Sequence, residues 1–212
     1  MKPILSSSLA LGLGLALTAC GGDDGGTARP IDAAGTPADA APPSTTFTLT
    51  TTAFPAGGTF ATDNTCHGAN TSPAFTWSNP PANARSFALV LTDLTIMRNH
   101  WVLYNIPVTA TGVPAHIENV FVPPSVTGAQ QTVSIKQDPN NPANTVTGYY
   151  GPCPPAPGQP MGGKHDYLFT LYAIDIDKIP GGTAQTTADQ EAPIVASHMI
   201  ASATFAASYT SP

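Results

Sequence analysis

The chain has 212 residues, of which 42% are hydrophobic and only 9% are charged, and it contains 23 prolines and 19 glycines. This composition is typical of a globular protein with many turns and little solvent-exposed helix. The net charge of −6, together with the lack of any cluster of basic residues, argues against nucleic acid as a partner.

The first residues have the features of a targeting segment. Lys2 is the only charge before an apolar run over residues 4–16, and the run leads into the sequence LTAC at 17–20. A membrane-spanning helix needs about 20 apolar residues, and this run is shorter and interrupted by serines. A small residue directly before a cysteine resembles the lipobox of bacterial lipoproteins, which implies a signal peptide over residues 1–19 and lipidation of Cys20. An ordinary secretory signal cut near Ala19 is the alternative.

Residues 20–44 have the composition of a linker. They contain one bulky aliphatic residue, Ile31, and no aromatic residue, among many glycines, alanines, aspartates and prolines. Such a segment cannot bury enough apolar surface to offset the entropy of ordering, so we expect a disordered tether. Residues 45–212 are numerous enough to form one domain with its own core.

Alternating apolar and polar residues predict the strands of this domain. In chain order the predicted strands are 46–54, 74–77, 86–93, 100–106, 133–135, 166–175 and 202–209. One helix is predicted from Thr187 to His198, with Asp189 and Glu191 in its first turn. The segments 107–131 and 136–165 are predicted loops, and loops this long are usually functional. The pattern indicates an antiparallel, mainly β domain with one or two peripheral helices.

The predicted strand over 166–175 is apolar on both faces, which is typical of a central strand covered on both sides. His165 and Tyr167 are two positions apart, so their side chains share one face, which continues with Phe169 and Leu171. Two polar rings at the end of such a strand either cap the core or line a pocket.

Two cysteines remain in the domain, Cys66 and Cys153. In an exported protein an even pair predicts a disulfide, and the alternatives are two buried free thiols or one reactive thiol. The sequence has no CxxC or Cys/His spacing that would indicate a metal site.

Three stretches, taken together and in this order, resemble the phosphatidylethanolamine-binding protein family, which includes the Raf kinase inhibitor protein. They are NTSPAFTW (70–77), LVLTD followed by HWVLYNIP (89–107), and GYYGPCPP followed by KHDYLFTLYAID (148–175). The nearest likeness is to the bacterial branch. The resemblance implies an antiparallel β-sandwich-like fold around a small pocket for phosphate or a phospholipid headgroup.

The resemblance also implies which residues form this pocket. Carried over one by one, the ligand-binding residues are Asp93, His100, Gly151, Pro152, His165 and Tyr167. Imidazole and phenol groups can donate hydrogen bonds to phosphate oxygens, and a carboxylate can keep a histidine protonated or receive an ammonium group. Where the family typically has Asp-Pro-Asp-Ala-Pro, this chain reads DLTIM at 93–97, so the second acid and both prolines are absent.

These observations predict a non-enzymatic binding module for a small anionic ligand, tethered by Cys20 to the bacterial cell envelope. We expect the outer membrane, facing the periplasm or the exterior, and no cofactor. A protein-interaction role as a kinase or protease inhibitor, by analogy with relatives, is the alternative. An enzyme is the third hypothesis: the sequence has no GxSxG, HExxH or P-loop, but Asp93, His100 and His165 could supply two histidines and a carboxylate to a metal.

Overall fold

The computed structural model describes residues 45–135 and 144–212. The predicted signal peptide, the lipidated Cys20 and the linker up to residue 44 lie outside the described residues, as do residues 136–143 of the second predicted loop.

The named strands form three sheets, and every pairing between them is antiparallel. In sheet order these are β1 (Thr48–Thr50), β2 (Phe75–Ser78) and β5 (Gly112–Val113); β10 (Met199–Thr210), β9 (Lys164–Ile174), β3 (Ser86–Asp93), β4 (Arg98–Pro107) and β6 (Gln130–Gln131); and β7 (Val133–Ile135) with β8 (Thr145–Thr147). The helix α1 covers Ala188–Ser197, and a 3-10 turn covers Thr62–Asn64.

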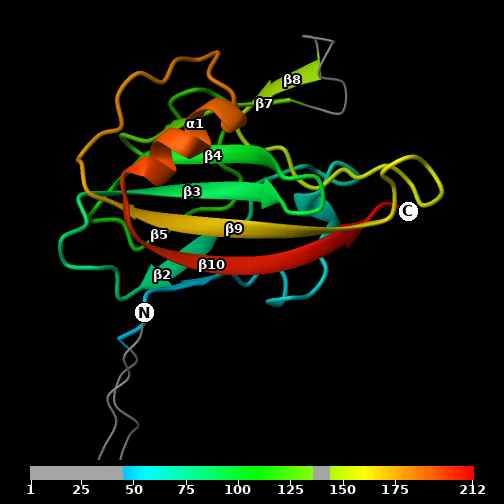
Figure 1. Ribbon diagram of the computed structural model, residues 1–212, viewed down its shortest axis with the longest axis horizontal. Helices are drawn as coiled ribbons and strands as arrows, with labels where there is room; N and C mark the ends of the chain where they lie inside the picture. The colour runs from blue at the N-terminus through cyan, green and yellow to red at the C-terminus, as the bar shows by residue number, and fades with distance from the viewer. Residues whose placement is uncertain (1–44, 136–143) are drawn as a thin grey trace, which may run out of the picture. The chain divides into compact units, whose positions relative to one another are not determined.

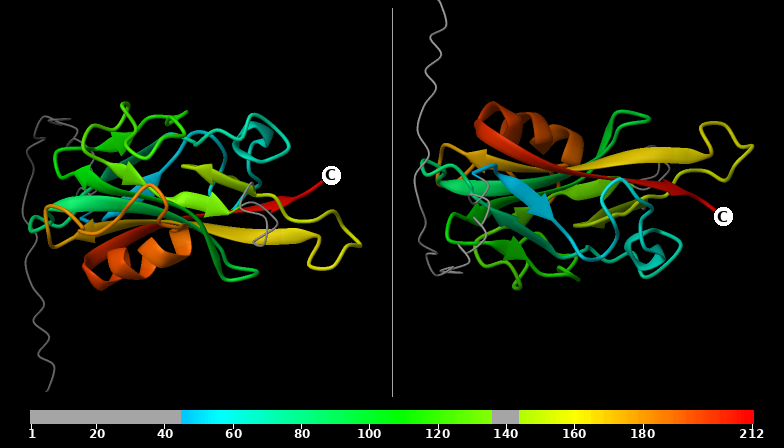
Figure 2. Two further views of the ribbon diagram at one scale, coloured as in Figure 1. Left: turned by 90° about the horizontal axis from the view of Figure 1, so that it is seen from above. Right: turned by 90° about the horizontal axis from the view of Figure 1, so that it is seen from below.

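The five-stranded sheet lies between two layers. Figures 1 and 2 show α1 on one of its faces and the small β1-β2-β5 sheet on the other. The period of two along β3 explains this arrangement. Phe87, Leu89 and Leu91 are buried in the core between the two sheets. Ala88 and Val90 are buried in a second core beneath α1. The mainly β, antiparallel, sandwich-like fold with a peripheral helix is therefore confirmed.

The strand β9 is central, as its apolar faces predict. It pairs with β10 on one side and with β3 on the other. Tyr167, Phe169 and Leu171 lie in the core between the sheets, and Ile174 lies in the core beneath α1. The two rings that open the strand therefore belong to the edge of the main core.

The first predicted strand is wrong in length. Only Thr48–Thr50 pairs with β2, which itself has only four residues. Beyond Thr50 the chain bends, and Phe54 enters the core, where its ring packs against Phe60 at a centroid distance of 4.5 Å. The alternation pattern predicted a strand up to residue 54. Burial of the Phe54 ring, rather than backbone pairing, holds the end of this segment in place.

The helix α1 begins directly after Thr187, where the sequence predicts its start. Thr187 and Gln190 form a capping box, in which the Gln190 side-chain oxygen accepts a hydrogen bond from the Thr187 backbone N–H at 2.9 Å. The helix also brings Glu191 into the second core. Glu191 is fully buried, and neither of its carboxylate oxygens has a hydrogen-bond partner.

Candidate functional site

The ends of three neighbouring strands meet at one edge of the large sheet. Asp93 ends β3, Arg98 begins β4, and His165 is the second residue of β9. In the antiparallel register Asp93 lies opposite both Arg98 and Tyr167. Figure 1 shows this edge beside the long yellow loop that leads into β9. Sheet pairing thus brings Asp93 and His165 together although they are 72 positions apart in the sequence.

Asp93 is buried, and both of its carboxylate oxygens are occupied. Oδ2 lies 2.6 Å from Nδ1 of His165. Oδ1 accepts hydrogen bonds from the backbone N–H groups of Thr95 at 2.9 Å and Ile96 at 3.3 Å. The carboxylate therefore fixes the turn between β3 and β4 and orients the histidine at the same time.

His165 is held between two acceptors. Its Nδ1 faces Asp93, and its Nε2 lies 2.9 Å from the carbonyl oxygen of Met161. Both nitrogens can donate only in the imidazolium form, so this environment favours a protonated ring. Burial by itself lowers the pKa of His165, but the hydrogen bonds to Asp93 and Met161 and the Asp93 charge outweigh it and raise the pKa.

A β-bulge turns His100 toward the same point. Leu91 pairs with Trp101 and the next residue of β3 pairs with Asn99, so His100 is the extra residue on β4. Its Nε2 lies 3.9 Å from Asp93 Oδ2, and its Nδ1 lies 3.2 Å from the carbonyl oxygen of Tyr150. Burial lowers the pKa of His100, which favours a neutral ring that donates from Nδ1 to this carbonyl.

Two tyrosine rings enclose His100. The ring of Tyr150 lies parallel to it, with centroids 6.3 Å apart, and the ring of Tyr167 meets it edge-on at 5.6 Å. The Tyr167 hydroxyl is buried and makes no hydrogen bond of normal geometry. Burial, together with the nearby charge of Asp93, raises the pKa of Tyr167, so the phenol keeps its proton.

These groups line one cavity of about 270 Å³. Its polar wall consists of Asp93, Arg98, His100, Tyr150, His165 and Tyr167. Its apolar wall consists of Ile96, Cys153, Pro154, Pro155, Pro160 and Met161. Four of the six residues predicted as ligand-binding, Asp93, His100, His165 and Tyr167, therefore converge, and the two rings that open β9 line a pocket.

Gly151 and Pro152, also predicted as ligand-binding, do not line this cavity. A Cβ atom on Gly151 would lie 2.1 Å from the carbonyl oxygen of Asn64, and its N–H donates to Asn70 Oδ1 at 2.9 Å. The carbonyl of Pro152 accepts from the backbone N–H of Cys66 at 3.1 Å. The glycine thus permits a close approach to backbone, but to the loop around Asn64 rather than to a ligand.

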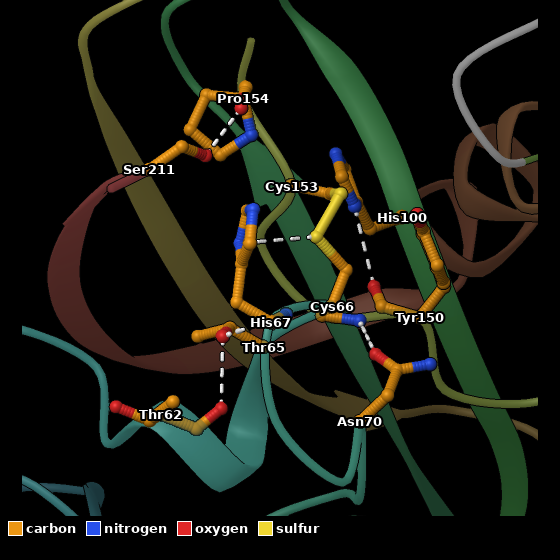
Figure 3. The surroundings of a disulfide bond; sticks show 11 residues. Thr62, Thr65, Cys66, His67, Asn70, His100, Tyr150, Cys153, Pro154 and Ser211 are labelled. Atoms are coloured by element: carbon orange, nitrogen blue, oxygen red, sulfur yellow. Dashed lines mark hydrogen bonds between the residues drawn. A yellow bond between two sulfur atoms is a disulfide. The ribbon is translucent and has the colours of Figure 1, made fainter. Parts of the chain in front are cut away.

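The predicted disulfide between Cys66 and Cys153 is present. It joins residues 87 positions apart in the sequence, with a Cα–Cα distance of 5.4 Å. Figure 3 shows it beside His100 and Tyr150, and Cys153 belongs to the cavity wall. The cross-link therefore fixes the loop that carries the proline side of the cavity.

The sequence did not predict several cavity residues, among them Arg98, Tyr150 and Met161. Arg98 precedes the apolar part of its strand, and its place opposite Asp93 depends on the hairpin register. Tyr150 lies in a loop, and no local sequence pattern predicts the path of that loop. Met161 takes part through its backbone carbonyl, which its positive φ of 57° helps to present to His165.

Two further properties bear on function. The described residues contain no group of three or more histidine, cysteine, aspartate or glutamate side chains that could hold a metal ion. Within residues 45–135 and 144–212, no helix is both long and apolar enough to span a bilayer.

Comparison with known proteins places the chain in a family. Residues 50–210 match the family model described as phosphatidylethanolamine-binding protein. A protein of Methanothermobacter thermautotrophicus of the UPF0098 group is 33% identical over 144 residues, which cover 65% of this chain and 83% of the relative. The predicted lipoprotein LppC of Mycobacterium tuberculosis is 32% identical over 201 residues, which cover 89% of this chain and 87% of LppC.

A solved structure shows the same fold. The crystal structure of Escherichia coli YbcL, described as a new member of the mammalian family, superimposes with a TM-score of 0.64 at 25% sequence identity. The match covers 78% of this chain and 99% of YbcL. The matched family model, the shared fold and the convergence of Asp93, His100, His165 and Tyr167 lead to one conclusion: this chain is a member of the phosphatidylethanolamine-binding protein family.

Proposed function

We propose that this domain is a non-enzymatic binding module whose cavity holds a small anion such as phosphate or a phosphate ester. The observation that carries the proposal is the charge of the cavity wall. Arg98, His165 and His100 line the cavity, whereas Asp93, the one acidic residue of the described lining, is already bonded to His165 and to two backbone N–H groups. A wall of this kind has a positive potential that favours anions.

The polar groups would act in different ways. His165 contributes charge rather than a hydrogen bond, because both of its nitrogens already have partners. The guanidinium of Arg98 and the buried Tyr167 hydroxyl supply donors, and His100 adds one when an anion stabilises its protonated form. A hydrogen bond that involves a charged group contributes roughly 1.5–3 kcal/mol net, so two or three of them suffice for a small anion.

We expect His165→Ala to weaken the binding of sulfate at least about tenfold, because it removes a cation and leaves Asp93 uncompensated beside the anion. Binding to the wild-type protein should also weaken as the pH rises. The cationic imidazolium attracts the anion, and the raised pKa of His165 places its loss of charge above the ordinary range for histidine. Calorimetric titration with sulfate, whose own charge is constant between pH 5 and 8, measures both effects.

The matched control is His198→Ala. His198 also contacts an aspartate, Asp175, at 3.0 Å, but it caps the C-terminus of α1 and does not line the cavity. This variant should bind sulfate as the wild-type protein does. Equal affinities of the wild-type protein and His165→Ala, or binding that strengthens as the pH rises, would contradict the anion site.

We further propose that the protein is anchored in the cell envelope, at the outer membrane, through a lipid on Cys20. The sequence LTAC at 17–20 supports this, and so does the similarity to LppC, whose name describes a lipoprotein. We expect Cys20→Ala to move the protein from the membrane fraction to a soluble or unprocessed form, because the thiol that carries the lipid is lost. Fractionation followed by immunoblotting measures this. Unchanged membrane association of Cys20→Ala would refute the anchor.

A further inference from the structure

Arg98 is the cavity residue whose charge forms no ion pair with any described residue. It begins β4, is half-buried, and lines the cavity. Within residues 45–135 and 144–212 its guanidinium makes no ion pair and no hydrogen bond. The contrast is Arg85, whose Nε and Nη2 bond to the two carboxylate oxygens of Asp177 at 2.9 and 2.6 Å. A half-buried guanidinium without a partner favours an anionic ligand group.

The same cavity offers no unpaired carboxylate to a positively charged ligand group. Asp93 is the only acidic residue of the described lining, and its two oxygens are taken by His165, Thr95 and Ile96. The carbonyl oxygens of Met161 and Tyr150 are likewise directed at the two histidines. An ammonium group would therefore lose its hydration and meet like charges in place of a counter-ion.

The apolar wall of the cavity indicates the chemical character of the rest of the ligand. Ile96, Met161 and the three prolines 154, 155 and 160 form it, and they offer apolar surface to whatever group is attached to the anion. Apolar surface stabilises an alkyl substituent by burial and gives no compensation to a charged one.

From this geometry we infer that the cavity selects phosphate monoesters with an uncharged, apolar substituent over the zwitterion phosphoethanolamine, and that Arg98 determines this preference. The inference rests on the proposed anion-binding function and adds a ligand class to it. The phosphate would bind to the guanidinium of Arg98, and the substituent would lie against the prolines. Two kinds of molecule have this chemistry: a free alkyl phosphate, and a lipid whose headgroup ends in a phosphate monoester.

The test uses two ligands that differ in one group. Propyl phosphate and O-phosphoethanolamine have the same number of heavy atoms, with a methyl group in the first where the second has an ammonium. In calorimetric titrations at pH 7 we expect the wild-type protein to bind propyl phosphate at least about tenfold more tightly, because like charges in a desolvated site repel strongly. Dihexanoyl phosphatidic acid serves as a third probe: tighter binding than propyl phosphate points to a lipid source of the ligand, and weaker binding points to a free ester.

Variants at position 98 test whether the charge of Arg98 causes the preference for propyl phosphate. Arg98→Met keeps an unbranched chain without the charge, and it should reduce the preference to less than about threefold. Arg98→Lys keeps a positive charge and should retain the preference, which separates charge from packing. Arg85→Met is the matched control, because it removes an arginine that is paired with Asp177 and does not line the cavity.

The outcomes separate this inference from the proposed function. Equal or tighter binding of phosphoethanolamine by the wild-type protein would overturn the preference while leaving the anion site intact. A preference that persists in Arg98→Met would overturn the role of Arg98. If neither ester binds, the proposed function fails and this inference fails with it.

Discussion

The double variant Cys66→Ser/Cys153→Ser is expected to lower the free energy of unfolding by roughly 4–5 kcal/mol, because the cross-link closes a very long loop in the unfolded chain. The two cysteines are 87 positions apart, so their linkage removes much of the entropy of the unfolded state. Urea unfolding of the oxidised wild-type protein and of the double variant measures the difference. Reduced wild-type protein should behave as the double variant does.

The same variant should weaken sulfate binding even where it is fully folded. Cys153 lines the cavity, and the segment that holds it also carries Tyr150, whose carbonyl accepts from His100. Without the cross-link this segment remains attached to the loop around Asn64 by Gly151 and by the Tyr149 hydroxyl, which donates to the Asn64 carbonyl at 2.7 Å. A loss of stability below about 1 kcal/mol would contradict the expected entropic contribution of the cross-link.

Glu191→Met is expected to stabilise the protein, and more so at pH 8 than at pH 4. The Glu191 carboxylate is fully buried beneath α1 without a hydrogen-bond partner, near the Tyr104 hydroxyl, which is also buried and unpartnered. Burial raises the pKa of Glu191 above its ordinary value. Leaving a buried charged group unsatisfied costs about 1–3 kcal/mol or more, and methionine removes that cost with little change in volume.

The sign of the pH dependence follows from the direction of the shift. A group whose pKa is raised by folding stabilises the folded state fully below its unfolded pKa, and this stability is lost as the pH rises through the folded pKa. The wild-type free energy of unfolding should therefore fall from pH 4 upward through this range, and the decrease should be smaller in both Glu191→Met and Glu191→Gln. Asp63→Asn, which removes an exposed negative charge, is the control for net charge. Parallel pH profiles of the wild-type protein and Glu191→Met, measured by urea unfolding, would disprove the effect.

The sequence by itself determined the elements whose patterns are local. The apolar residues over 86–93 and 166–175 identified β3 and β9, because a strand covered on both faces has apolar side chains at nearly every consecutive position. Asp189 and Glu191 in the first turn likewise indicated the start of α1 from neighbouring residues. The resemblance to the family identifies Asp93, His100, His165 and Tyr167 as pocket residues from the sequence.

Only the tertiary structure decided how these residues work together. The bulge that turns His100 inward depends on the pairing of β4 with β3, and the position of Arg98 opposite Asp93 depends on the same register. The Met161 carbonyl that engages the second nitrogen of His165 depends on the course of a loop. The close packing of Gly151 against Asn64 depends on the approach of two loops. Each of these contacts joins backbone segments that are distant in sequence, and strand pairing and loop packing determine it. A local pattern of side chains therefore cannot predict it.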